Sequence, residues 1–164
     1  MRYNKIVKFE ISNGKGIGMS LFTQGCHFHC EGCFNPETWD FSKGEKWTAE
    51  VEEHFMKLVG RPYISRITFV GGEPLIFSNL PDLLKLVRRI KEQYPNKKIW
   101  VYSGFTYENM WQMQKEVLQY ADVLVDGQFD INKRDITLAF RGSSNQRVID
   151  LQKTREKGEV VLYE

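Results

Sequence analysis

Residues 64–104 read ISRITFVGGEPLIFSNLPDLLKLVRRIKEQYPNKKIWVYSG, and this stretch decides the fold. The run from Ile64 to Val70 is rich in β-branched residues, which predicts a buried strand that ends at Gly71-Gly72. Apolar residues then recur at helical spacing over residues 80–90, and residues 99–102 form another short apolar run. Short buried strands separated by an amphipathic helix predict parallel pairing through a right-handed crossover.

Helix boundaries around this unit can also be predicted from the sequence. Asn79 is expected to cap the helix, with Pro81 in its first turn. Upstream, Thr48 is expected to cap a helix that Gly60 ends, and downstream Thr106 is expected to begin another.

The same alternation of strand and helix extends along most of the chain. Residues 17–23 and 123–125 are further apolar runs, so strands are predicted on both sides of the central unit. A complete eight-unit barrel needs about 250 residues, whereas this chain has 164. The sequence therefore predicts an α/β fold, namely a partial, open (β/α) barrel with parallel strands and helices outside, in a single domain over residues 1–164.

Chemically distinctive residues follow the ends of four predicted strands. Cys26, Gly71, Ser103 and Asp126 each come directly after such an end. Because the carboxyl ends of parallel strands meet at one edge of a sheet, we expect these four positions to face one site.

Three cysteines lie within the loop 26–33, which reads CHFHCEGC, and the chain has no fourth cysteine. Soft thiolate ligands suit iron–sulfur clusters and zinc. Three thiolates leave one iron of a four-iron cluster without a protein ligand, and an open coordination position is typical of catalytic sites. The alternative is zinc held by the cysteines and either His27 or His29, although zinc loops usually bring two separated ligand pairs.

The sequence Gly71-Gly72-Glu73-Pro74 follows a strand and precedes a helix. Two glycines let the backbone approach a ligand closely, and Glu73 offers a carboxylate to an ammonium group. A strand-ending turn with no ligand is the alternative. The glycine-rich residues 14–18 precede a strand instead of opening a helix, so they predict a hairpin turn and not a phosphate loop.

Composition limits the classes of function. Hydrophobic residues make up 41%, and the formal net charge is +2 from 23 basic and 21 acidic residues. A dedicated nucleic-acid binder would be more basic, and no apolar run approaches the ~20 residues of a membrane span. We therefore expect a protein that binds neither nucleic acid nor membrane. An odd, clustered set of cysteines fits a disulfide framework poorly, so we also expect a cytoplasmic location.

The cysteine spacing C-x3-C-x2-C after one strand, with Gly-Gly-Glu-Pro after the next, resembles the radical S-adenosylmethionine (SAM) enzymes. In that family the cysteines hold a [4Fe-4S] cluster whose open iron binds SAM, and one electron cleaves SAM to a 5′-deoxyadenosyl radical. The resemblance implies cluster ligands and cofactor-binding residues, but no catalytic side chain, because the cluster and SAM carry the chemistry. The implied ligands are Cys26, Cys30 and Cys33. The implied SAM contacts are Gly32, Cys33 and Phe34 near the adenine, Gly71, Gly72 and Glu73 at the amino group, and Ser103 and Asp126 along the cavity.

Four further segments narrow the likeness: residues 34–39, 100–105, 123–129 and 141–146. Over about residues 13–148 the chain is similar to the short glycyl-radical-enzyme activases. The resemblance implies an enzyme that makes a glycyl radical on anaerobic ribonucleoside-triphosphate reductase, with a reduced flavodoxin-like protein as electron donor. The alternatives are an activase of another glycyl radical enzyme, or a non-catalytic iron–sulfur or zinc-binding module.

Overall fold

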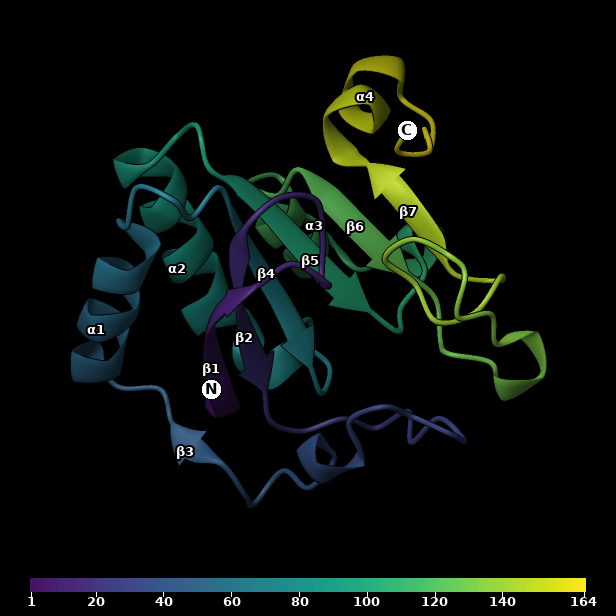
Figure 1. Cartoon of the computed structure of the whole chain (residues 1–164), viewed down its shortest axis with the longest axis horizontal. Helices are drawn as coiled ribbons and strands as arrows, with labels where there is room; N and C mark the ends of the chain where they lie inside the picture. Colours follow the sequence, from purple (N-terminus) through teal and green to yellow (C-terminus); the bar gives the residue numbers. More distant parts are fainter.

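The computed structural model describes residues 1–164 as one open, seven-stranded sheet with four helices (Figure 1). The strands are β1 (Arg2–Glu10), β2 (Gly18–Thr23), β3 (Glu45–Lys46), β4 (Arg66–Gly71), β5 (Lys98–Ser103), β6 (Val123–Asp126) and β7 (Arg147–Asp150). The helices are α1 (Ala49–Val59), α2 (Leu80–Gln93), α3 (Gln112–Leu118) and α4 (Leu151–Lys157). No helix is long and apolar enough to cross a membrane.

The sheet has the strand order β3-β1-β2-β4-β5-β6-β7 and is mixed. Its centre, β2, β4, β5 and β6, is parallel. The outer strands β1, β3 and β7 are antiparallel to their neighbours, so the expectation of parallel strands throughout is wrong at both edges. The reason at one edge is that residues 11–17 join β1 to β2 as a hairpin, and so short a connection cannot make a crossover. The α/β class and the open sheet are confirmed.

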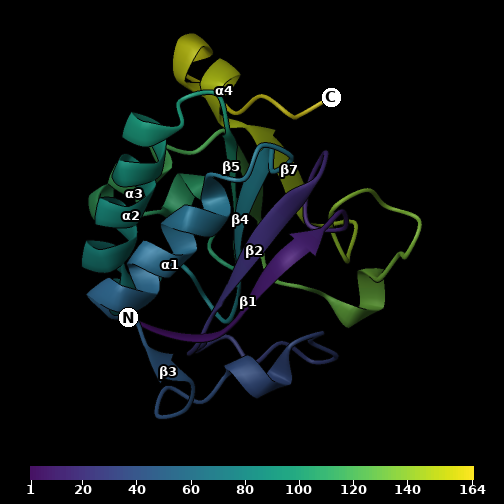
Figure 2. The same ribbon diagram turned by 60° about the vertical axis from the view of Figure 1, so that its left-hand side comes forward.

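The main core lies between the sheet and helices α1, α2 and α3, which cover one face (Figure 2). Phe55 of α1, Leu83 of α2 and Val117 of α3 are all fully buried in a cluster of 24 residues. On the other face lies the long connection between β6 and β7, seen in green in Figure 2.

The predicted helix starts have mixed outcomes. Thr48 caps α1 as expected, because its Oγ1 accepts a hydrogen bond from the Val51 N–H at 3.2 Å. Asn79 occupies the N-cap position of α2, but its side chain donates to the carbonyls of Glu73 and Pro74 and makes no cap. Thr106 precedes only a short 3₁₀ turn, and α3 begins at Gln112, so that boundary was wrong.

The β1–β2 hairpin is held by a buried ion pair at the start of β4. The Arg66 Nη1 lies 2.7 Å from the Glu10 Oε1 and 3.0 Å from the Asn13 carbonyl, and its Nε donates to the Lys15 carbonyl. Burial alone would raise the pKa of Glu10, but hydrogen bonds from Arg66 and Ser20 outweigh it and lower the pKa to about 2. The glycine-rich residues 14–18 are therefore a hairpin turn wrapped around a guanidinium, as their position before a strand predicted.

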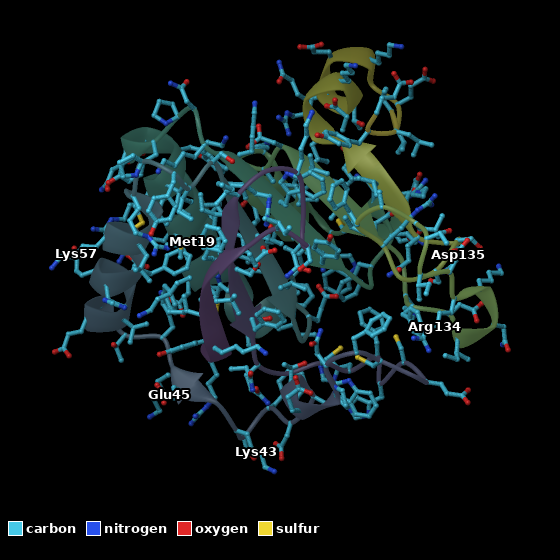
Figure 3. The ribbon with its side chains drawn as sticks, viewed as in Figure 1. Met19, Lys43, Glu45, Lys57, Arg134 and Asp135 are labelled. Carbon is cyan, nitrogen blue, oxygen red and sulfur yellow. The ribbon has the colours of Figure 1, made fainter.

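We predict that Arg66→Met destabilises the chain by about 3–5 kcal/mol, because it leaves the Glu10 carboxylate buried without its partner. Urea denaturation followed by circular dichroism measures the change. Lys57→Met is the control, since Lys57 is exposed on α1 and extends away from the sheet (Figure 3). A loss below about 1 kcal/mol for Arg66→Met would contradict a structural role for the pair.

Candidate functional site

The ends of the four parallel strands converge on one small pocket of about 120 Å³. The loop after β2 contributes the three cysteines, and residues at and after the ends of β4, β5 and β6 complete the walls. The pocket is lined by Cys26, Phe28, Cys30, Cys33, Trp39, Val70, Gly71, Gly72, Glu73, Tyr102, Ser103, Gly104, Val125, Gly127, Gln128, Phe129 and Gln146. Residues from four separate parts of the chain thus meet at one edge of the sheet, because the strands that carry them are neighbours in it.

The loop that carries the cysteines is closed at its base by hydrogen bonds. The Gly25 N–H donates to the Thr38 carbonyl at 2.6 Å, and the Cys26 N–H donates to the Trp39 carbonyl at 3.1 Å. The buried Gln24 side chain donates to two more carbonyls in the same segment, those of Glu37 and Asp40. The thiols therefore stand on a loop whose two ends are tied together.

All three thiols are free and line the pocket. Burial raises the pKa of Cys26 and of Cys30. No three His, Cys, Asp or Glu side chains lie close enough together to hold a single metal ion. Thiolates on one zinc ion must surround one atom, whereas thiolates on a cubane bind different irons and stay further apart. The donor set therefore fits a cluster better than zinc.

Neither histidine of the loop lines the pocket. The His27 ring packs against Phe41 at a centroid distance of 4.6 Å. The His29 ring stacks on Trp39 at 4.4 Å with an interplanar angle of 9°. These contacts disfavour the alternative in which a histidine completes a zinc site.

Gly71, the last residue of β4, and Gly72 after it allow backbone to lie directly against backbone. The Gly72 N–H donates to the Thr23 carbonyl and the Glu73 N–H donates to the Gly25 carbonyl, both at 2.9 Å. A Cβ on Gly72 would lie 2.5 Å from the Gly25 oxygen. Gly71 has a φ of +104°, and a Cβ there would lie 2.7 Å from the Thr23 nitrogen. The backbone approach in the structure is to the base of the cysteine loop, and the approach to a ligand stays a prediction.

Glu73 is fully buried, and its carboxylate joins the ends of two strands. Its oxygens accept hydrogen bonds from the Gly104 N–H at 2.6 Å, the Leu75 N–H at 2.9 Å and the Ser103 hydroxyl at 2.9 Å. Burial raises the pKa of Glu73 to about 7, against the opposing effect of these donors. Ser103 therefore lines the pocket while it holds Glu73 in place.

Asp126, unlike Ser103, does not line the pocket. Its carboxylate is buried, pairs with Arg147 at 2.6 Å and accepts the Tyr107 N–H at 2.8 Å. The adjoining residues Val125 and Gly127 line the pocket, but Asp126 does not. A role for Asp126 in binding a cofactor stays a prediction.

A second cavity, of about 540 Å³, adjoins the cysteine pocket and shares Val70, Tyr102, Phe129 and Gln146 with it. Phe34 lines this larger cavity, and its ring lies 5.1 Å from that of Phe129. Gly32 lines neither cavity; a Cβ there would lie 2.6 Å from the Ile131 side chain. The loop between β6 and β7, which carries Arg134 and Asp135 in Figure 3, forms the outer wall.

Ten residues that line the pocket were not predicted as site residues: Phe28, Trp39, Val70, Tyr102, Gly104, Val125, Gly127, Gln128, Phe129 and Gln146. Val70, Tyr102 and Val125 end predicted strands, and this position was the signal that could have identified them. Gln146 closes the long loop, because its Oε1 accepts from the Gly142 and Ser143 N–H groups and its Nε2 donates to the Gly127 carbonyl. The segment 141–146 thus shapes the site through its hydrogen bonds.

We predict that Gly72→Ala reduces cluster binding, because its Cβ would displace the backbone next to Cys26. The measurement is iron and sulfide content after anaerobic reconstitution. Gly158→Ala is the control: no atom lies within 4 Å of a Cβ there, so it carries only the strain of a positive φ. Equal iron content in the two variants would show that this backbone contact does not position the loop.

Glu73 should make the cluster-free chain less stable as the pH rises. Its folded pKa of about 7 lies above the ordinary 4.5, so its contribution is complete below pH 4.5 and falls as the pH rises to 7. The fall amounts to roughly 3 kcal/mol. Urea denaturation at several pH values should show a flatter profile for Glu73→Gln than for the wild type. The control Glu50→Gln, at an exposed position, should keep the wild-type profile; an unchanged profile for Glu73→Gln would contradict this prediction.

Known proteins are similar to this chain over most of its length. Residues 12–149 match the family described as "4Fe-4S single cluster domain". The anaerobic ribonucleoside-triphosphate reductase-activating protein of Escherichia coli K12 is 38% identical over 93% of this chain and 100% of its own length. The proteins of the same name from Vibrio cholerae and phage T4 are 37% and 35% identical, over 89% and 90% of this chain and 96% and 93% of their own lengths. The chain therefore belongs to the family of anaerobic ribonucleoside-triphosphate reductase-activating proteins.

Proposed function

We propose that this chain is a radical SAM activase that generates a glycyl radical on anaerobic ribonucleoside-triphosphate reductase. The observation that carries the proposal is the convergence of three free thiols with the Gly71–Glu73 turn on one pocket at the strand ends. Family membership over nearly the whole chain supports the same conclusion.

The residues present fit a [4Fe-4S] cluster. Cys26, Cys30 and Cys33 would hold three irons, and no fourth cysteine exists to close the remaining position. When bound, the cluster and SAM supply a one-electron cleavage of the C5′–S bond to methionine and a 5′-deoxyadenosyl radical, which takes a hydrogen atom from the target glycine. The chain itself supplies the pocket that encloses the cluster and the positions of the thiolate ligands.

The adjoining cavity provides the volume that SAM requires. At about 120 Å³ the cysteine pocket is small, whereas the cavity of about 540 Å³ lies within the range of roughly 300–1,000 Å³ typical of small-molecule sites. We place the adenine of SAM near Gly32, Cys33 and Phe34, because Phe34 offers an aromatic face there.

The turn after β4 is proposed to meet the amino group of SAM. Gly71 and Gly72 leave the wall of the pocket free of side chains, and Glu73 brings a carboxylate to it. Ser103 is proposed to act by holding Glu73. Asp126 lines neither cavity, so it is proposed to act indirectly: its bonds to Arg147 and to the Tyr107 N–H hold the end of β6, where Val125 and Gly127 line the cysteine pocket.

The proposal also includes the domain organisation, the electron donor and the cellular location. We propose that residues 1–164 act as one domain of the partial-barrel radical SAM type, which the single open sheet supports. We also propose a reduced flavodoxin-like electron donor and a cytoplasmic location, where thiols stay reduced. An activase of another glycyl radical enzyme is the rival function.

Anaerobic reconstitution tests the function. The wild-type chain, loaded with iron and sulfide, reduced and given SAM, should form 5′-deoxyadenosine. With the reductase present, paramagnetic resonance should show a glycyl radical. Cys30→Ala should lose the four-iron cluster and both products, whereas Lys57→Met should keep them.

The outcomes separate the alternatives. A loaded wild-type cluster that yields no 5′-deoxyadenosine would refute the enzyme. Formation of 5′-deoxyadenosine with a glycyl radical only on a different glycyl radical enzyme would instead favour the rival activase. Full cluster loading of Cys30→Ala would refute the ligand assignment.

A further inference from the structure

One buried polar side-chain atom in the whole chain has no hydrogen-bond partner, and it is the indole Nε1 of Trp39. An indole N–H can only donate. Burying such a donor without an acceptor costs about 1–3 kcal/mol. Native structures rarely keep such a group without a reason, and one common reason is an acceptor that binds later.

Trp39 belongs to the wall of the cysteine pocket, beside all three thiols. Its position is set from several sides. Its carbonyl accepts the Cys26 N–H at 3.1 Å, and its own N–H donates to the Pro36 carbonyl at 3.2 Å. The His29 ring stacks in parallel on the indole at 4.4 Å. The indole ring of Trp39 is therefore held against the cysteine loop by contacts with the loop and with the segment that follows it.

The other tryptophans differ from Trp39 in surroundings. Trp47 donates its indole N–H to Glu52 at 3.1 Å. Trp111 is 62% exposed, so its N–H has access to water. None of Trp47, Trp100 and Trp111 lines the pocket. The unsatisfied donor thus occurs on the one tryptophan that adjoins the thiols.

We propose that the indole N–H of Trp39 donates a hydrogen bond to a sulfur of the [4Fe-4S] cluster and thereby tunes its reduction potential. The proposal rests on the proposed function, because it requires the cluster to be bound. Thiolate and sulfide are the acceptors that a loaded pocket brings next to this ring. A donor to sulfur stabilises the more negative, reduced cluster, so it raises the potential and eases the uptake of the electron.

The first test compares reduction potentials without SAM. Trp39→Phe keeps an aromatic ring for His29 to stack on and removes the donor, together with part of the ring. In a redox titration followed by paramagnetic resonance, the variant should be harder to reduce. We expect a tenfold change in the one-electron equilibrium constant, about 59 mV towards negative potential. Trp111→Phe, which loses an indole N–H outside the pocket, should titrate as the wild type does.

The second test needs no variant at Trp39. Tryptophan labelled with ¹⁵N in the indole is incorporated into the wild-type chain, and pulsed paramagnetic resonance is recorded on the reduced cluster. A ¹⁵N coupling identifies Trp39, because no other tryptophan lines the pocket. This test still decides the question if Trp39→Phe fails to bind iron.

The results separate this inference from the proposed function. An unchanged potential in Trp39→Phe at equal iron content, or no ¹⁵N coupling in the wild type, would overturn the hydrogen bond. In either case 5′-deoxyadenosine and the glycyl radical could still form, and the activase would stand. A wild-type chain that binds no four-iron cluster would overturn both.

Discussion

The contact between the backbone of Gly71–Glu73 and that of Thr23–Gly25 is the constraint on which the site depends. Two hydrogen bonds of 2.9 Å join these segments, and neither glycine has room for a side chain. The contact joins the end of β4 to the start of the cysteine loop. Because the loop is also closed at residues 38 and 39, its thiols keep a defined position relative to the sheet.

The buried carboxylate of Glu73 extends this arrangement to the next strand. It receives donors from both sides of the pocket, Leu75 after β4 and Ser103 and Gly104 at the end of β5. A carboxylate that is buried and bonded in this way is costly to form and difficult to replace. The same side chain therefore supports the fold and lines the pocket.

Interactions within a few residues along the chain were the most predictable. Thr48 was correctly expected to cap α1, because its partner Val51 is only three residues away. The side chain of Asn79 instead bonds backbone carbonyls of the preceding turn, and the sequence pattern does not distinguish these partners. The antiparallel direction of the outer strands β1 and β7 was not predicted. Strand direction there depends on the paths of the hairpin and the loop and not on the hydrophobic pattern alone.

The chemistry of the site was already evident in the amino-acid sequence: three cysteines at a spacing suited to a cluster, no fourth cysteine, and a glycine-rich turn after the next strand. It also predicted that these features share one edge of the sheet, because strands that alternate with helices pair in parallel, as they do at the centre of this sheet. Only the tertiary structure decided that Asp126 bonds Arg147 outside the pocket and that the indole N–H of Trp39 lacks a partner. Both outcomes depend on which residues, far apart in the sequence, come within hydrogen-bond distance of each other. Tertiary packing decides this.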